Sequence, residues 1–262
     1  MSSSIKKQLK RILWVLLPFL VVILIWQIIV ELKIFRPYLL PSPVVVFYDF
    51  IVKAIYTKVL IYNIEESLTR LSWGYAVGIS SGLLLGLVMG LNRITARFFE
   101  PLIEFAHAIP GIAWVPFAVL WFGIGNKTII FIVFLSVFFP VLYGALTGVK
   151  TLSVKFSNVA LMFGAKKWQV VVYVLLPGAM PSIMNGIRIG AAFGWRGLVA
   201  AEMIASSSGI GWMIVDARSW LNTETVILGA IIIGIFWIVM DRLILKTLEA
   251  KTIEKWGMIS TS

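Results

Sequence analysis

Residues 163–181 read FGAKKWQVVVYVLLPGAMP and differ from the chain around them. Most of the sequence is apolar enough to lie in lipid, whereas this stretch carries two adjacent lysines and two prolines, Pro177 and Pro181. A proline removes a backbone donor and clashes with the preceding helical turn, so we expect these prolines to end a helix and redirect the chain. The stretch therefore predicts a bent segment outside the membrane.

The composition of the whole chain indicates a polytopic membrane protein. Of its 262 residues, 60% are hydrophobic and 13% are charged, and the mean hydropathy is +0.97. A water-soluble domain of this length needs a far more charged surface. The lack of cysteine excludes disulfides and thiolate metal sites, and the single His107 cannot build an imidazole cluster. We expect no metal, no cofactor and no catalytic residue.

Six stretches approach the 20 or so apolar residues that a membrane span needs. They are residues 12–32, 71–91, 112–123 with an amphipathic lead-in from Phe98, 128–149, 182–205 and 226–245. The expected fold is all-α, with six transmembrane helices. After the first span, Pro41 and Pro43 indicate an extended turn followed by a short surface helix.

The Lys and Arg residues indicate that both termini are cytoplasmic. With the N-terminus inside, fourteen basic residues fall on the cytoplasmic side and six on the outer side, as the positive-inside rule requires. Their position beside apolar runs argues against nucleic-acid binding as the reason for the net charge of +11. The opening MSSSIKKQLKR runs into a long apolar stretch without a cleavage signal, so we expect a retained first span.

This topology gives a domain organisation with one large cytoplasmic loop. We expect a cytoplasmic tail (1–11), a first span (12–32), an outer segment (33–66), a five-helix core (67–245) that includes the cytoplasmic loop 150–181, and a second cytoplasmic tail (246–262). The stretch quoted above lies in that loop.

Glycine recurs every four residues through the second expected span, at Gly74, Gly78, Gly82, Gly86 and Gly90. Such a row winds slowly along one side of a helix and lets another backbone approach closely. We expect it to pack against a helix of the same chain. A seam between two copies, or a sliding surface, is the alternative.

The cytoplasmic loop resembles that of the transmembrane permease subunits of bacterial ATP-binding-cassette importers. The matching stretch is NVALMFGAKKWQVVVYVLLPGAMPSI, with the family's Gly at Gly164 and its Leu-Pro at Leu176 and Pro177. The family's initial Glu is replaced by Asn158, whereas Ala160 matches. The segments LPSPVVV, IPGIAWVPFAVLWFGIGNKT and LVAAEMIASSSGIGWMI are similar to the sulfonate, nitrate and taurine branch of these permeases.

The resemblance implies a type I importer permease fold in the bacterial inner membrane and a small, anionic solute of the sulfonate, nitrate or taurine kind. It implies two cytoplasmic ATP-binding subunits that hydrolyse ATP, an external substrate-binding protein, a second copy of the permease, surrounding lipid and no nucleic acid. The positions that it assigns to ATPase coupling are Asn158, Ala160, Gly164, Ala165, Lys166, Lys167, Trp168, Leu176 and Pro177.

The residues of the loop fit a rigid elbow between two helices. Residues 158–163 can form a short helix, which Gly164 can end in the left-handed conformation. A second helix over 165–175 places apolar side chains in one stripe for packing, at Trp168, Val171, Val172 and Leu175. Lys166 and Lys167 either meet acidic groups of a partner or only satisfy the positive-inside rule.

Three charged residues in the fifth span are candidates for the translocation pathway, because charges inside a membrane are costly. We expect Arg188 to reach the cytoplasmic headgroups and Glu202 to lie near the outer interface, where it locks helix ends or meets the binding protein. Arg196 has no such exit. It either lines a water-filled path that favours an anion, or pairs with a polar group on a neighbouring helix.

Two other functions remain as alternatives at this point. An ATP-independent secondary transporter would carry acidic or histidine groups at mid-membrane for ion coupling, whereas Glu202 lies near the edge and His107 fits a hydrogen-bonded helix end. A multi-pass membrane enzyme would cluster nucleophiles, carboxylates or metal ligands at one interface, and the sequence indicates no such cluster.

Overall fold

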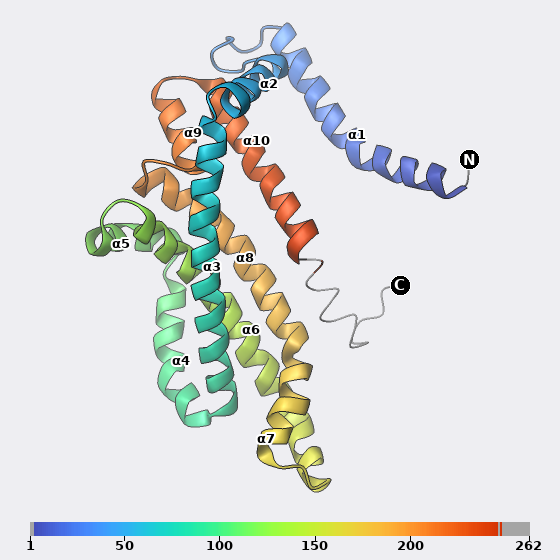
Figure 1. Cartoon of the computed structure of the whole chain (residues 1–262), viewed down its shortest axis with the longest axis vertical. Helices are drawn as coiled ribbons and strands as arrows, with labels where there is room; N and C mark the ends of the chain where they lie inside the picture. The colour runs from blue at the N-terminus through green and yellow to red at the C-terminus, as the bar shows by residue number, and fades with distance from the viewer. Residues whose placement is uncertain (1–2, 246, 248–262) are drawn as a thin grey trace. The chain divides into compact units, whose positions relative to one another are not determined.

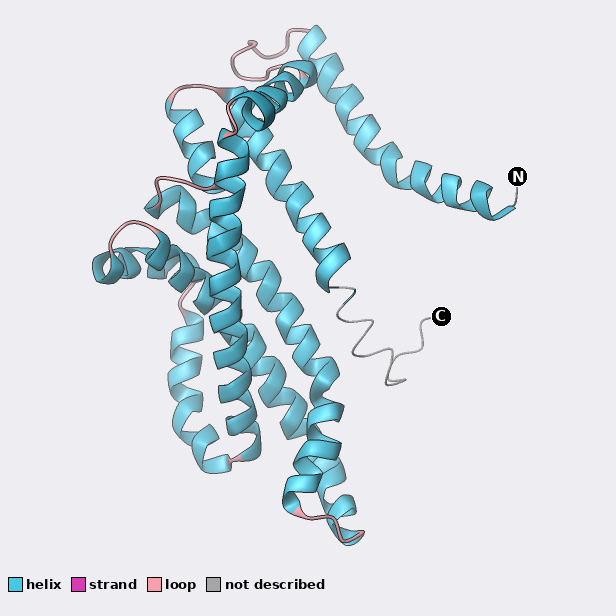
Figure 2. Ribbon diagram, viewed as in Figure 1, coloured by secondary structure: helices cyan, strands magenta, loops and turns pink. Residues whose placement is uncertain are grey.

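The computed structural model describes residues 3–245 and 247, and every regular element within them is a helix (Figures 1 and 2). The elements are α1 (Ser3–Glu31), α2 (Pro43–Ile51), η1 (Val52–Tyr56), α3 (Val59–Leu91), α4 (Arg93–Ala108), η2 (Gly111–Trp114), α5 (Val115–Phe122), α6 (Asn126–Met162), α7 (Lys167–Val170), η3 (Val171–Leu175), α8 (Leu176–Ala205), α9 (Ile210–Ser219), α10 (Thr223–Val239) and η4 (Met240–Leu245). The all-α fold is confirmed. The tail expected at 246–262 lies outside the described residues, except residue 247.

The chain divides into two compact units, each described here by itself. The first unit is Met1–Ile61 with Met213–Ile231. Within it, the short surface helix expected after Pro41 and Pro43 is confirmed as α2, and the Ser42 hydroxyl accepts a hydrogen bond from the backbone of Val45 at its start. The Thr225 hydroxyl donates to the Asp49 carboxylate at 2.9 Å.

The expected six spans are confirmed only in part among the described residues. Four helical stretches are long and apolar enough to cross a membrane, namely Val59–Leu91, Asn126–Leu152, Lys167–Ala205 and Thr223–Leu243. In α1 the described side chains give an apolar helix only over Leu17–Glu31, so the count of six spans is not confirmed. The third expected span is a bent pair, in which Arg93–Ala108 and Gly111–Phe122 meet at 93°.

The bend in the third span follows from Pro110. The residue before a proline is driven out of the helical region, and Ile109 has extended backbone angles, with φ −80° and ψ 120°. Helix α4 therefore stops at Ala108, and the chain restarts in a new direction as η2 and α5. The break lies in the second compact unit, Tyr62–Trp212 with Ile232–Ser262, which contains the core of the protein.

The glycine row of α3 packs against α6 of the same chain, as expected. A Cβ atom added at Gly74 would lie 2.4 Å from Val133, and one at Gly82 would lie 2.7 Å from the carbonyl oxygen of Phe138. At Gly86 the nearest atom is the carbonyl oxygen of Leu142, at 2.5 Å. Only hydrogen fits in these positions, so the row is a contact between helices within the chain.

A neighbouring side of α6 approaches α8 just as closely. A Cβ atom at Gly144 would lie 2.8 Å from the carbonyl oxygen of Ser182, and one at Gly186 would lie 2.6 Å from that of Pro140. Helix α6 is thus held between α3 and α8 by direct backbone contact, which lipid-immersed helices use in place of hydrophobic collapse. Buried side chains such as Val137, Val141 and Ala145 fill the rest of this core.

We expect Gly86→Ala to lower the thermal stability of the purified protein in detergent. The new methyl group meets backbone rather than a flexible side chain, and overpacking of this kind costs about 1–3 kcal/mol. The matched control is Gly234→Ala in α10, where an added Cβ has nothing within 4 Å. A higher helix propensity without a clash should leave that variant as stable as the parent or slightly more so. Equal unfolding temperatures for the two variants would contradict the packing described here.

Candidate functional site

The elbow between α6 and α7 is ended by glycine, as the sequence predicts. Gly164 has φ +82°, and its N–H donates to the carbonyl of Leu161 at 3.0 Å, while the N–H of Ala165 donates to that of Ala160 at 3.1 Å. These two bonds form the Schellman arrangement that closes a helix at a left-handed residue. The short helix expected over 158–163 is the last part of α6, which runs unbroken from Asn126 to Met162.

The second arm of the elbow is continuous with the following span, so the expectation that Pro177 and Pro181 end a helix is wrong. Helical residues run from Lys167 to Ala205. The backbone reaches Pro177 through a π-helical turn, Val171–Leu175, in which the N–H of Leu176 donates to the carbonyl of Val171. In a π turn each N–H bonds the carbonyl five residues before it instead of four. The hydrogen-bond pattern has therefore shifted by one residue before Pro177, which has no N–H to donate, and the helix continues through the proline.

The packing face of this arm also differs from the expected stripe. Val170 and Leu175 are the buried residues, and they lie in one cluster with Val149 and Ala179. Of the expected stripe, Val171 and Leu175 pack against this cluster, whereas Trp168 and Val172 are exposed. The exposed apolar side chains at the elbow are Met162, Phe163, Trp168, Val172 and Tyr173.

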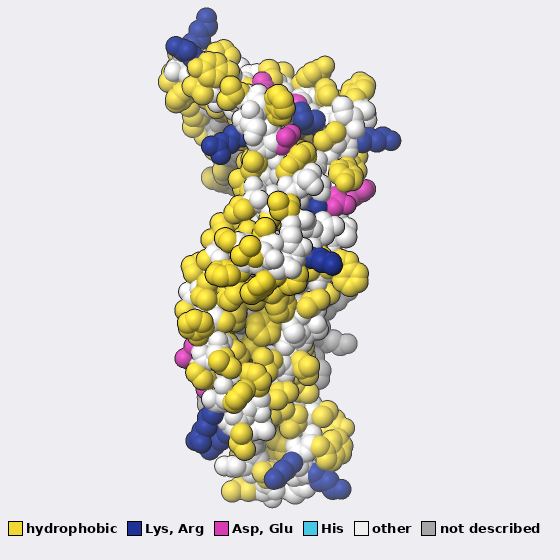
Figure 3. Space-filling model, turned by 90° about the vertical axis from the view of Figure 1, so that its left-hand side faces the viewer, with side chains coloured by type: hydrophobic (Ala, Val, Ile, Leu, Met, Phe, Trp, Pro, Cys, Tyr) yellow, Lys and Arg dark blue, Asp and Glu magenta, His cyan; other side chains and the backbone are white. Residues whose placement is uncertain are grey.

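The other predicted coupling residues lie at or beside this exposed surface. Asn158, Lys166 and Lys167 are exposed, and the backbone N–H of Lys166 donates to the side chain of Gln169 at 2.7 Å. Among these predicted coupling residues, the half-buried ones are Ala160, Ala165, Leu176 and Pro177. In the lower part of Figure 3, where α7 lies, basic side chains are found beside hydrophobic ones.

Glu202 belongs to a buried ion-pair network that sequence reasoning missed. Its carboxylate has no exposed surface and lies 2.9 Å from the Arg70 guanidinium. It also accepts hydrogen bonds from the Ser67 hydroxyl at 2.8 Å and from the backbone of Gly211 at 3.0 Å. Arg70 and Glu202 are 132 residues apart, so no local pattern links them.

Arg70 completes this network, because its guanidinium donates to four further oxygens. It bonds the carbonyl of Ser208 at 2.8 Å, the side chain of Asn126 at 2.8 Å and the carboxylate of Glu66 at 3.0 Å, and it contacts the Ser208 hydroxyl. The ion pair thus joins α3, the start of α6, the end of α8 and the loop that follows α8. A buried charge pair is tolerated only when its remaining donors and acceptors are satisfied in this way.

The two arginines of α8 lie in different surroundings. Arg188 forms an ion pair with Asp241 in η4, at 3.1 Å, rather than lying free toward the headgroups. Arg196 is exposed and makes no hydrogen bond or ion pair with any residue that the structure describes. Of the three charged candidates in the fifth span, only Arg196 is left without a partner within the described chain.

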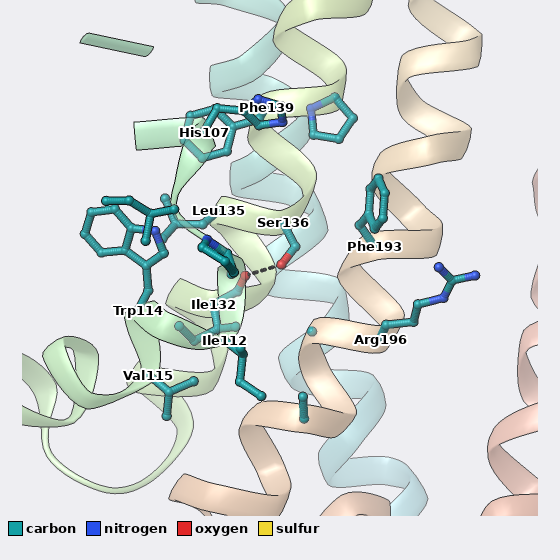
Figure 4. Close-up of a pocket in the computed structure, with 16 residues that line it drawn as sticks. His107, Ile112, Trp114, Val115, Ile132, Leu135, Ser136, Phe139, Phe193 and Arg196 are labelled. Atoms are coloured by element: carbon teal, nitrogen blue, oxygen red, sulfur yellow. Dashed lines mark hydrogen bonds between the residues drawn. The ribbon is translucent and has the colours of Figure 1, made fainter. Parts of the chain in front are cut away.

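A cavity of about 330 Å³ lies at the break between α4 and η2, against α6 and α8. Its polar lining comes from His107, Trp114, Ser136 and Arg196. Figure 4 shows the Arg196 side chain leaving α8 on the side away from His107 and Trp114, so Arg196 stands at the rim. Residues 163–181 do not contribute to this cavity.

His107 lies at the end of α4 beside two aromatic rings. Its ring lies 5.2 Å from those of Phe139 and Tyr143, and it lies in the last turn of α4, as expected, without a hydrogen bond to another described residue. No group of three or more His, Asp or Glu side chains among the described residues is placed to hold a metal ion.

Comparison with known proteins matches most of the chain to one family. Residues 78–247 match the family described as "Binding-protein-dependent transport system inner membrane component". The taurine transport system permease protein TauC of Escherichia coli (strain K12) is 34% identical over 225 residues, which are 84% of this chain and 82% of TauC. The putative aliphatic sulfonates transport permease protein SsuC of Bacillus subtilis (strain 168) is 34% identical over 236 residues, which are 90% of this chain and 84% of SsuC.

A third relative is named for a different solute. The bicarbonate transport system permease protein CmpB of Synechococcus elongatus is 31% identical over 256 residues, which are 92% of this chain and 91% of CmpB. The family match and the identities along nearly the full length agree with the resemblance of the cytoplasmic loop. This chain belongs to the family of inner-membrane permease components of binding-protein-dependent transport systems.

Proposed function

We propose that this chain is the permease subunit of an ATP-driven importer, forms the pathway for a small anionic solute, and receives the motion of cytoplasmic ATPase subunits through residues 158–177. The observation that carries the proposal is the elbow, a rigid glycine-closed turn with large apolar side chains exposed at its tip. Exposed aromatic and Met side chains on a rigid support are typical of a surface that docks into another protein.

The arrangement of the two arms supports coupling rather than attachment alone. One arm is the end of α6 and the other leads through η3 into α8, so both arms continue as helices that run into the core. A displacement of the elbow would therefore move α6 and α8 without an intervening flexible loop. The partners proposed on this side are two ATP-binding subunits, with Lys166 and Lys167 facing either acidic groups of those subunits or anionic lipid.

Arg196 supports an anionic solute. A guanidinium at this depth cannot remain in lipid, and it has no partner within the described chain, so we propose that it faces a hydrated path at the junction with a second copy of the permease. Its charge would attract an anion and deter cations. The names of TauC, SsuC and CmpB support a sulfonate, taurine or bicarbonate type of solute.

We assign the other two charged candidates mainly to structure. Arg188 has a carboxylate partner in Asp241, and Glu202 has no exposed surface. Glu202 would therefore hold helix ends together, rather than touch the solute. An external binding protein would dock on the side opposite the elbow, and the elbow itself and both termini would be cytoplasmic.

Reconstitution tests the proposal as a whole. We expect uptake into proteoliposomes only when the cognate ATPase subunits, the binding protein and ATP are all present. Uptake that persists without the ATPase subunits would contradict the proposal and favour an ATP-independent transporter.

Gly164→Pro should uncouple ATP hydrolysis from uptake, with uptake at least tenfold lower and membrane insertion unchanged. Proline requires φ near −65°, whereas this position has φ +82°. The matched control is Gly164→Asn, because Asn tolerates the left-handed conformation and an added Cβ meets nothing within 4 Å. ATPase activity and solute uptake of the same preparation are measured together. Normal solute uptake by the Gly164→Pro variant would contradict the coupling role of the elbow.

Arg196→Leu should reduce anion uptake about tenfold or more while the assembled complex stays intact, since an exposed and unpartnered side chain contributes little to folding. Arg196→Lys, which keeps the charge, should retain a measurable part of the uptake. Size-exclusion chromatography of the complex provides the assembly readout. Unchanged uptake in Arg196→Leu would remove Arg196 from the pathway.

Replacing one residue of the buried Arg70–Glu202 pair should lower the stability of the protein more than replacing both. Arg70→Met or Glu202→Gln leaves an uncompensated or poorly paired group, and breaking a buried pair costs about 3–5 kcal/mol. The double variant Arg70→Met with Glu202→Met should unfold at a higher temperature than Arg70→Met and regain uptake. A double variant that is restored in stability but remains inactive would instead favour direct contact of Glu202 with the solute.

A further inference from the structure

We propose that the solute leaves the cavity at the break between α4 and η2 through a water-filled path that runs toward the elbow, between a polar stripe of α4 and a polar stripe of α6. The inference rests on the proposed function and adds to it the route and the residues by which the solute reaches the cytoplasm. It follows from the spacing of polar residues on the two helices, from their exposure and from the contacts that join the stripes.

Helix α4 carries a polar stripe along its whole length. At about 100° per residue, the members of the stripe lie within about 80° of one another around the helix. They are Arg93, Arg97, Glu100, Glu104 and His107. Arg97 and Glu104 are exposed and make no ion pair or hydrogen bond with any residue that the structure describes. Glu104 lies about 16 Å along the helix from Arg93, and a charge at that depth in a membrane needs water or a partner.

The other exposed side of α4 is apolar. It consists of Ile94, Phe98, Leu102 and Phe105. The centre of this apolar side lies about 140° around the helix from the centre of the polar stripe. A helix with one apolar and one charged side lies where an apolar surrounding meets water. The apolar side of α4 therefore suits lipid, whereas the polar stripe needs a hydrated space inside the protein.

Helix α6 carries a second polar stripe, whose members follow one another at spacings that keep side chains on one side of a helix. They are Ser136, Tyr143, Thr147 and Lys150. Ser136 and Tyr143 are half-buried, whereas Thr147 and Lys150 are exposed. The stripe of α6 is thus increasingly open from the cavity toward the end of the helix that leads into the elbow.

Contacts at three levels place the two stripes beside each other. At the first level, His107 and Ser136 both line the cavity. At the second level, the rings of His107 and Tyr143 lie 5.2 Å apart. At the third level, Lys150 and Glu100 form an ion pair at 3.1 Å in which both side chains remain more than 40% exposed. The stripes therefore run together from the cavity to the elbow end of α4 and α6.

The charges along this path favour passage over retention of an anion. The path begins at the cavity, where Arg196 stands at the rim. Glu104 comes next, and its unpaired carboxylate repels an anion, so a solute that has left Arg196 finds no second site in which to lodge. Arg93 and Arg97, nearer the cytoplasm, would then attract the anion outward from the path.

The test uses the fact that the chain has no cysteine, so that each new thiol is unique. Glu104→Cys and Phe105→Cys are a matched pair, since the two positions are neighbours at the same depth on different sides of α4. The permease is assembled with its ATPase subunits in lipid nanodiscs without nucleotide and is labelled with the charged reagent 2-sulfonatoethyl methanethiosulfonate. We expect the Glu104→Cys variant to be labelled about tenfold faster or more, because the reagent reacts with a hydrated thiolate.

Two further measurements connect the stripes to transport. The Thr147→Cys variant reports from α6 and should be labelled about as fast as Glu104→Cys, within about threefold. When ATP and vanadate hold the ATPase subunits closed, labelling at both positions should slow about tenfold or more, because the path toward the elbow closes in that state. Attachment of the reagent to Glu104→Cys should lower uptake, measured before and after labelling of the same preparation, whereas treatment of Phe105→Cys should not.

The outcomes separate this inference from the proposed function. Labelling of Glu104→Cys and Thr147→Cys that is no faster than that of Phe105→Cys would mean that the stripes face lipid or a dry contact, and it overturns the inference. Fast labelling that ATP and vanadate do not change overturns it as well, because the water would then belong to a surface outside the transport cycle. ATP-dependent uptake by the unlabelled parent would stand in both cases, and only the absence of that uptake defeats the proposed function.

Discussion

The close approach of three helix backbones is the constraint on which the rest of this structure depends. Lipid offers no hydrophobic drive for one apolar helix to join another, so contact must come from shape and dispersion. Glycines of α3 and α6, and Gly186 of α8, leave room only for hydrogen between neighbouring backbones. Because backbone atoms cannot move aside as side chains do, the register of α3, α6 and α8 is fixed. The cavity and the buried ion pair both depend on that register.

The sequence predicted those features that depend on neighbouring residues. The four-residue glycine row identified a close helix contact, and Gly164 with its flanking residues identified the left-handed end of α6. The short helix α2 followed from Pro41 and Pro43. In each case a steric rule acts within one or two turns of the chain, so the sequence alone carries enough information.

The features that the sequence did not predict depend on residues far apart or on a balance between local and tertiary forces. Arg70 is explained by its ion pair with Glu202, and no periodic pattern in the sequence connects the two residues. Pro177 locally predicts the end of a helix. The helix nevertheless continues, because a π turn precedes the proline and Leu175 packs against the core. The expected stripe packs only at Val171 and Leu175, while Trp168, one turn earlier, stays exposed because no element of the described chain covers it there.

Together these contacts give α8 one fixed end and one driven end. At the fixed end, Glu202 is bonded to Ser67 and Arg70 of α3 and to the backbone of Gly211, whereas the other end begins at the exposed elbow. Arg196 is six residues before Glu202, about 9 Å along the helix. If a partner displaces the elbow, the Glu202 end resists and the middle of the helix must tilt or slide against α6. The cavity between α6 and α8 lies on that stretch, so a displacement of the elbow would change the shape of the cavity through helix packing alone.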